Sequence, residues 1–311
     1  MQDREATMPS VHAVGNDSVR SQNIFGQPLT IFGIPVDRET IFSDHKGIYR
    51  IRTEKRQRKL IVKSTFIKFF LHHEETIRCL TTGYSPVSIK EQLITGPAFL
   101  YFKKAIFIFT NKRILHVPTR FNRSQYGAVS QILYEDCARI IMKGRTLHVD
   151  YKNGRQEAFP YLGRQEKKKL RTLIAGVTLS PKEAGQLKSR VHLCPSCTHI
   201  LQPGDKICET CKMKFKTPFK AKLFSLLIPG GGYFYSRFKI IATAAGLFET
   251  ALMTVLVLQG LALHRGTPVA LHWVALPAFA LVLEKFVMAY HTQTLIQNVI
   301  PEKGDYAVRK I

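Results

Sequence analysis

The stretch Phe107–Val117 reads FIFTNKRILHV, with two apolar runs on either side of a polar segment. Phenylalanine, isoleucine and valine favour extended backbone, and the intervening Thr110-Asn111-Lys112 segment is typical of a tight turn. The stretch therefore predicts a β-hairpin whose strands are Ala105–Thr110 and Arg113–Pro118.

The same alternation continues on both sides of this hairpin, between residues 74 and 176. Turn signals such as Lys143-Gly144-Arg145 separate the apolar runs, and a helix is predicted from about Arg164 to Ala175. Seven strands followed by one helix predict a small β-barrel closed at one end by the helix. The five strands outside the hairpin are Thr76–Thr82, Ala128–Tyr134, Ala138–Met142, Thr146–Tyr151 and Gln156–Phe159.

Several of these segments resemble the bacterial PH-like and GRAM-like domain family. In that family a Thr-x-x-Arg segment leads into an apolar strand, which Thr110, Arg113 and Ile114 match, and a later strand pair precedes a capping helix. The acidic opening His73-Glu74-Glu75 and the segments ILYEDCARI and LHVDYKNGRQEAF fit the same order. The resemblance implies a PH-like seven-strand barrel over residues 74–178. Many members of the family bind phosphoinositides or acidic peptides, and many bind neither.

Basic residues gather around the first strands of this domain. Such a cluster predicts a patch for anionic lipid headgroups, at about 1 kcal/mol for each basic residue near the membrane surface. A solvated basic face beside an acidic leaflet explains the same residues, and both explanations stay open. The six residues are Lys103, Lys104, Lys112, Arg113, Arg120 and Arg123.

Two long apolar runs, Ile240–Leu263 and Val269–Tyr290, follow near the end of the chain. As helices they would be about 36 Å and 33 Å long, enough to cross a hydrocarbon core of about 30 Å. Only His264–Pro268 separates them, and neither run has a polar face at helical spacing. The pattern predicts a two-helix transmembrane hairpin rather than two buried helices of a soluble bundle.

The charge distribution predicts the orientation of this hairpin. Of the 46 lysine and arginine residues, 41 precede Ile240, as do 18 of the 22 acidic residues. The turn between the spans carries only Arg265, and positive residues stay on the cytoplasmic side. Residues 1–23 have no apolar core of the kind found in a signal peptide. We expect an integral protein of a bacterial inner membrane, with both termini in the cytoplasm.

A shorter apolar stretch, Leu223–Tyr235 (LFSLLIPGGGYFY), precedes the first span. It is too short to cross a membrane, and we expect Pro229 and the triple glycine 230–232 to break any helix there. The string PGGGYFY resembles the Pro-Gly-rich lead-in found before hairpin spans in several small bacterial membrane proteins. Whether this stretch lies at the interface or enters the membrane stays open.

Two acidic residues, Glu249 and Glu284, lie inside the predicted spans, where a charge is costly. Counted from the cytoplasmic ends Ile240 and Tyr290, they fall at comparable depths, so they could face each other or a neighbouring subunit. Pairing of an acid with Lys285, or extension of its side chain to the interface, is a structural alternative. Because two acids on one hairpin do not make a transport path, we favour the structural explanation.

Four of the six cysteines form two Cys-x-x-Cys pairs, Cys194/Cys197 and Cys208/Cys211, with ten residues between them. Each pair can form a tight turn that directs two thiolates to one point, and two turns complete a tetrahedral site for one structural Zn²⁺. The segment resembles a compact zinc ribbon. Disulfides are disfavoured in the cytoplasm, and a thioredoxin-like redox motif leaves the second pair without a role. We expect Cys79 and Cys137 to be ordinary buried cysteines.

Together these features predict an α+β multidomain chain. Residues 1–53 are expected to be mostly disordered or extended, and 54–73 to form a basic amphipathic helix that packs on the adjacent domain or lies on the membrane. The further boundaries are the PH-like domain 74–178, a linker 179–190, the zinc ribbon 191–217, a basic juxtamembrane segment 218–239, the hairpin 240–290 and a cytoplasmic tail 291–311.

No nucleotide-binding loop, nucleophile elbow or metalloprotease motif occurs in the chain, so we do not expect an enzyme. We expect a membrane-anchored adaptor that binds anionic lipid headgroups or a protein segment. One alternative is a nucleic-acid-binding protein at the membrane, although the ribbon has only Phe215 nearby for stacking on bases. Another is an accessory subunit of a membrane transport or enzyme complex that uses Glu249 and Glu284.

Overall fold

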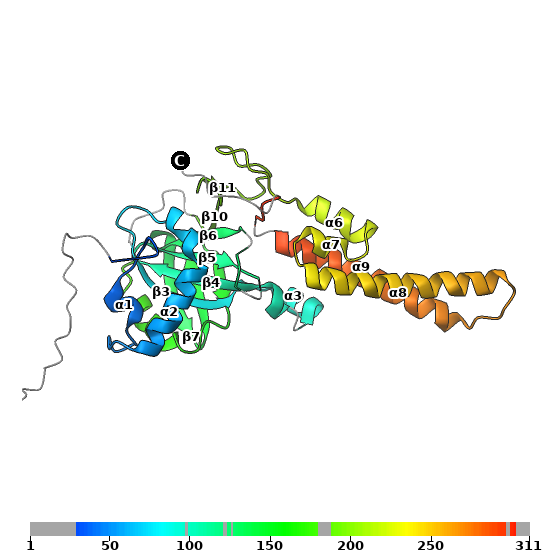
Figure 1. The fold of residues 1–311 in the computed structure, drawn as a ribbon, viewed down its shortest axis with the longest axis horizontal. Coiled ribbons are helices and arrows are strands. Elements are labelled where there is room, and N and C mark those ends of the chain that lie inside the picture. Colours follow the sequence, from blue (N-terminus) through cyan, green and yellow to red (C-terminus); the bar gives the residue numbers. More distant parts are fainter. Residues whose placement is uncertain are drawn as a thin grey trace, which may run out of the picture.

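The structure is a computed structural model that describes residues 29–96, 99–120, 123–125, 127–179, 188–296 and 299–302. It has a mixed α+β fold in which a β-rich body lies at one end of a long pair of helices (Figure 1). All seven expected strands are present, each with its ends within two residues of the expected positions.

The seven expected strands lie in two open antiparallel sheets instead of the closed barrel expected from the sequence. The larger sheet has the order β11-β10-β6-β5-β4-β3, and the smaller has the order β7-β8-β9. The free edge of β6 pairs with β10, a strand from the cysteine segment, while β7 begins the second sheet after a 3₁₀ turn at Tyr134–Asp136. The strands are β3 (Ile77–Tyr84), β4 (Lys104–Thr110), β5 (Arg113–Pro118), β6 (Val129–Leu133), β7 (Cys137–Lys143), β8 (Thr146–Tyr151), β9 (Gln156–Phe159), β10 (Val191–Leu193) and β11 (Ile200–Leu201).

Apolar side chains fill both faces of the larger sheet. Along β4, Ile106 and Ile108 belong to one core, and Phe107 and Phe109 belong to the other. The first core is covered by the N-terminal elements, and the second by β7–β9 together with helix α5 (Lys167–Ala175). Burial on both faces explains why β4 is a continuous apolar run instead of an alternating one.

The N-terminal segment differs from the expectation, because residues 29–53 are folded. They form β1 (Thr30–Ile31), β2 (Ile34–Pro35), α1 (Arg38–Phe42) and the start of α2. The apolar side chains of this segment, among them Ile41, are buried against the larger sheet. Burial of these residues supplies the free energy that orders a segment with little periodicity of its own. Residues 1–28 lie outside the described part of the chain.

The expected helix over residues 54–73 is helix α2 (Ile51–Lys63) followed by a 3₁₀ helix at Thr65–Phe69. Its buried face packs on the sheet. There the Gln57 amide donates to the Leu80 carbonyl (2.8 Å), and the Leu80 amide donates back to Gln57 (3.0 Å). Of the two locations considered for this helix, it therefore takes the one against the adjacent domain.

Helices α8 (Lys239–His264) and α9 (Leu271–Ile296) run side by side and extend away from the β body (Figure 1). Their most apolar windows have mean hydropathies of 1.9 and 1.5, and only 11% and 6% of the residues in those windows are buried. Both helices are long and apolar enough to cross a membrane. Helix α9 continues past Tyr290, the end expected for the second span.

The base of this helix pair packs on the β body. The ring of Phe102 stacks on Tyr233 with centroids 5.6 Å apart, and it meets Phe238 and His291 edge-on at 4.8 Å and 4.2 Å. Phe102 ends helix α4 (Phe99–Phe102), which follows α3 (Ile89–Thr95). Helices α6 (Pro218–Leu227) and α7 (Gly231–Tyr235) lie beside the same base (Figure 1).

Candidate metal centre and helix junction

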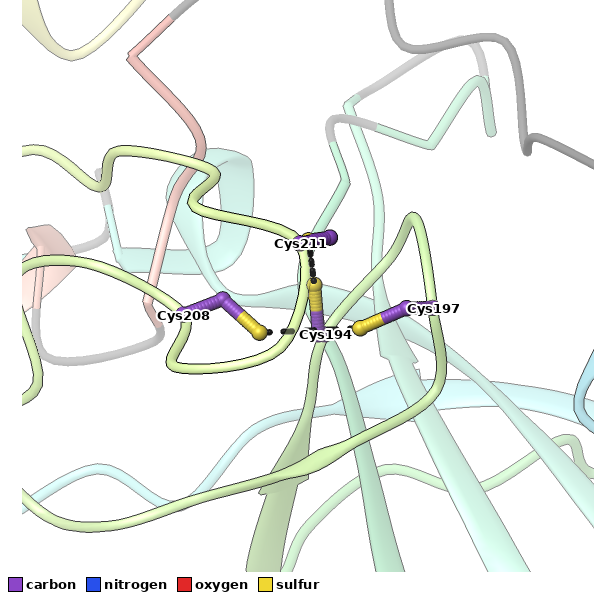
Figure 2. Close-up of side chains that lie close together, drawn as sticks. All are labelled: Cys194, Cys197, Cys208 and Cys211. Atoms are coloured by element: carbon purple, nitrogen blue, oxygen red, sulfur yellow. Dashed lines mark hydrogen bonds between the residues drawn. The ribbon is translucent and has the colours of Figure 1, made fainter. Parts of the chain in front are cut away.

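Two loops bring the four cysteines of the ribbon segment together (Figure 2). The sulfurs of Cys194 and Cys211 lie 3.4 Å apart, and those of Cys197 and Cys208 lie 3.5 Å apart. All four sulfurs lie within 4.8 Å of one another, and none of the four cysteines is in a disulfide. The spacing suits one metal ion at the centre of a tetrahedron of thiolates.

The two loops have the same backbone conformation. The amide of Cys194 donates to the His199 carbonyl, and the amide of Cys208 donates to the Met213 carbonyl, both at 2.8 Å. The residue after each second cysteine is left-handed, with φ of 62° and 58°. Non-glycine residues adopt this conformation at a cost, so its repetition indicates that both turns are built to aim their sulfurs.

The sulfurs are partly shielded from water and lie close to backbone amides. Burial raises the pKa of Cys194, and it raises the pKa of Cys197 to about 11. Backbone amides also point to the sulfurs, since those of Ser196 and Cys197 are hydrogen-bonded to Cys194. A metal ion would replace the thiol protons and balance four negative charges, and the donor set fits a soft or borderline metal.

The cysteine unit is bonded to the rest of the molecule at both ends. At one end, β10 pairs with β6 in the larger sheet. At the other, the Lys216 amide donates to the Ile300 carbonyl and the Glu302 amide donates to the Lys214 carbonyl, both at 2.8 Å. Residues 300–302 follow α9, so the unit joins the sheet to the end of the helix pair.

Two of the six basic residues expected to form a patch, Lys103 and Arg113, are buried. Lys103 is 5% exposed and forms an ion pair with Glu91 at 2.8 Å, while Arg113 is 2% exposed and pairs with Glu75 at 2.8 Å. Each of these two cations is fixed in a buried ion pair, which removes it from the surface. The other four residues, Lys104, Lys112, Arg120 and Arg123, are half-buried or exposed.

The Thr-x-x-Arg segment forms a buried polar network. Arg113 donates to both carboxylate oxygens of Glu75, at 3.0 Å and 2.8 Å, and the amides of Lys112 and Arg113 donate to the Thr110 hydroxyl. That hydroxyl lies 2.8 Å from Glu75. Burial raises the pKa of Glu75, but the hydrogen bonds from Arg113 and from the His72 amide outweigh burial and lower it. The segment closes the β4–β5 hairpin, so its role is structural.

Glu249 and Glu284 lie close to each other, and Glu249 is fully buried. Glu249 forms an ion pair with Lys285 and accepts a hydrogen bond from the Gly230 amide (3.1 Å), and Lys285 donates to the Ser225 carbonyl (2.9 Å). The ion pair joins α8 to α9, and its hydrogen bonds attach the α6–α7 segment to both. This is the pairing with Lys285 that the sequence offered as an alternative.

The triple glycine permits a close approach between helices. A Cβ at Gly230, where φ is +64°, would lie 2.1 Å from the Ala242 carbonyl oxygen, and one at Gly232 would lie 2.0 Å from the Ser225 hydroxyl. The helix breaks after Leu227, as expected from Pro229, but α7 resumes at Gly231. The glycines therefore seat α7 against α6 and α8.

No family model matches the chain, and comparison with curated proteins and with solved structures also found no match.

Proposed function

We propose that the protein is a membrane-anchored, non-catalytic adaptor that holds a PH-like domain at a membrane surface. The observation that carries the proposal is the attachment of the cysteine unit, which is hydrogen-bonded to β6 on one side and to residues 300–302 on the other. A unit attached at both ends fixes the orientation of the domain, whereas a free linker would leave it variable.

The order of elements supports a PH-like domain over residues 74–178. Four consecutive strands, β3–β6, lie in one sheet, and three, β7–β9, lie in a second. Helix α5 follows and packs on the core that the two sheets share, through Leu170 and Ile174. The Thr110–Arg113 segment leads into β5, as in the family that the sequence resembles.

The metal is proposed to be one structural Zn²⁺ held by Cys194, Cys197, Cys208 and Cys211. Four thiolates in a compact tetrahedron suit zinc, and they leave no open position for water or a substrate. The ion would fold residues 191–217 and thereby stiffen the link between the sheet and the helix pair.

The helix pair is proposed to span a bacterial inner membrane, with the β body in the cytoplasm. The apolar side chains of α8 and α9 are exposed, which a protein surrounded by water avoids over so large an area. The excess of lysine and arginine before Ile240 favours the cytoplasm for the body and both termini. Pairing of Glu249 with Lys285 favours a structural role for the buried acids over a transport path.

The adaptor proposal predicts a metal-dependent orientation of the β body. Spin labels at Lys143→Cys in the β7–β8 turn and Thr267→Cys in the hairpin turn report their distance in the full chain in nanodiscs. We expect a narrow distance distribution in the zinc-loaded protein and a broader one in Cys208→Ser. Cys79→Ser, which changes a buried cysteine outside the cluster, should keep the narrow distribution. An unchanged distribution in metal-free Cys208→Ser would contradict coupling through the metal unit.

A further inference from the structure

A polar cleft of about 660 Å³ lies where the β body meets α9. Its walls come from the segment before α3, from β9, from Arg190 just before β10, and from Tyr290, Gln293 and Thr294 of α9. The cleft uses none of the cysteine ligands, and Lys103 is the one member of the six-residue basic cluster that lines it.

The charges in this cleft balance. Lys103 is paired with Glu91 at 2.8 Å, and Arg190 is paired with Glu157 at 3.1 Å, so two cations and two carboxylates line one space. Arg190 uses its Nε for Glu157, while its Nη1 is buried without a hydrogen-bond partner among the described residues. The lining of the cleft therefore places a guanidinium beside a carboxylate, a charge arrangement complementary to that of a zwitterion.

An apolar groove of about 650 Å³ adjoins the cleft and lies between α6 and α9. Leu226 of α6, Met253 of α8, and Leu281, Val282 and Phe286 of α9 form its apolar lining. Two lysines also line it, Lys222 of α6 and Lys285 of α9, and Lys285 is paired with Glu249. From Leu281 to Gln293 the groove follows α9 for about 18 Å. An elongated groove with an apolar lining along a membrane-spanning helix can hold an acyl chain.

The two spaces adjoin. Tyr290 and Gln293 line both the polar cleft and the apolar groove, so a molecule with a polar head and an apolar chain can occupy both at once. Neither residue stands out in the sequence, because a tyrosine and a glutamine near the end of an apolar run are typical of any span that reaches the interface.

The surface around the cleft is suited to the boundary of a bilayer. Helix α3, whose Glu91 lines the cleft, exposes Ile89 (77%) and Leu93 (80%) on its outer side. Helix α6, which borders the groove, exposes Phe219 (74%) and Leu227 (72%). These apolar side chains flank the base of the helix pair, where a polar headgroup layer would meet the hydrocarbon.

We propose that the cleft and the groove together bind one phospholipid of the phosphatidylethanolamine class. Arg190 donates to the lipid phosphate, Glu157 accepts from the ammonium group, and one acyl chain lies along α9 in the groove. Because the two ion pairs leave the cleft lining without net charge, the cleft favours a zwitterionic headgroup over an anionic one. A primary ammonium donates hydrogen bonds to a carboxylate and a choline cannot, so ethanolamine fits better than choline. The inference rests on the proposed membrane anchoring.

Native mass spectrometry of the full chain in detergent tests the site, with phosphatidylethanolamine, phosphatidylcholine and phosphatidylglycerol offered separately to delipidated protein. We expect one phosphatidylethanolamine to be retained about tenfold more strongly than either of the others, as one charge-assisted contact predicts. Val87→Trp places a large ring in the cleft and leaves all four members of the two ion pairs in place, so it should abolish this retention. Ile89→Trp, two residues away and outside the cleft, is the matched control.

Stronger retention of phosphatidylglycerol, or equal retention of phosphatidylethanolamine by the wild type and Val87→Trp, would overturn the site. If the wild-type protein is extracted from membranes by alkaline carbonate, the anchoring itself fails. If it resists extraction but retains no lipid, only the lipid site fails, and the two failures are thus distinguished.

Discussion

Several buried ion pairs connect different parts of the fold. Arg113 pairs with Glu75 inside the sheet, Lys103 pairs with Glu91 beside α9, and Lys285 pairs with Glu249 between the long helices. A buried pair adds little net stability compared with apolar packing, but removing one member leaves the other charge buried and unpaired. These pairs therefore specify which elements meet.

The Arg113–Glu75 pair predicts a pH dependence of stability. The pKa of Glu75 is lowered from its ordinary value of 4.5 in the folded protein. Its contribution is therefore complete above that value and is lost as the pH falls through the folded pKa. Urea unfolding of the full chain in detergent should show a steeper loss of stability below pH 4.5 for the wild type than for Glu75→Gln. Exposed Glu135→Gln is the control, and a Glu75→Gln profile as steep as that of the wild type would refute the prediction.

The Glu249–Lys285 pair predicts an asymmetric response to substitution. Glu249→Gln removes the carboxylate that forms the ion pair with Lys285 and should lower the free energy of unfolding by about 3–5 kcal/mol. The double variant Glu249→Gln/Lys285→Met should recover part of that loss. Glu284→Gln should cost less, because the ion pair with Lys285 is formed by Glu249. Thermal unfolding in detergent measures all three, and equal losses for Glu249→Gln and Glu284→Gln would count against the pairing.

Sequence patterns identify residue types at this scale but not their partners. Lys103 and Arg113 were expected on the surface because they sit in a local run of basic residues. Their partners Glu91 and Glu75 lie 12 and 38 positions away, and only the fold brings them together. The four cysteines are a different case, because their spacing in the sequence is enough to predict that their sulfurs lie together.

Among the helices, the glycines 230–232 at the start of α7 explain how a short apolar stretch packs beside two long helices. Gly230→Ala combines a left-handed backbone with a Cβ 2.1 Å from a carbonyl oxygen. We expect it to lower the free energy of unfolding by about 1–3 kcal/mol, measured by denaturation in detergent. Gly260→Ala in α8 has no atom within 4 Å of the new Cβ and should be neutral or slightly stabilising. Equal stability of the two variants would contradict the close packing.

The attachment of β10 to β6 predicts how far the effect of metal loss extends. Cys194→Ser should abolish binding of the proposed metal and expose the amides of residues 191–217, and the edge of β6 should lose protection with them because β10 is its partner. The β7–β9 sheet should keep its protection. Hydrogen exchange and metal analysis of the full chain measure both effects, with Cys137→Ser as the control. Unchanged exchange at β6 would show that β10 pairs without the metal.

Across the fold, the strands and helices that depend on the local sequence pattern could be predicted. The seven strands, helix α5 and the two long helices each follow from periodicity or length. The open sheets were not predictable, because they depend on β10 taking the edge of β6, and β10 is only three residues long. The folded structure of residues 29–53 could not be predicted either, because it depends on burial against a sheet that is formed by later residues.

The central claim, that the helix pair crosses a membrane and the β body stays on one side of it, is tested most directly by cysteine labelling. A membrane-impermeant maleimide is applied to sealed right-side-out vesicles that contain Thr267→Cys or Lys143→Cys, with the wild type as background. We predict labelling of Thr267→Cys in sealed vesicles, and labelling of Lys143→Cys only after the vesicles are opened. Labelling of both sites in sealed vesicles, or of Lys143→Cys alone, would contradict the proposed topology.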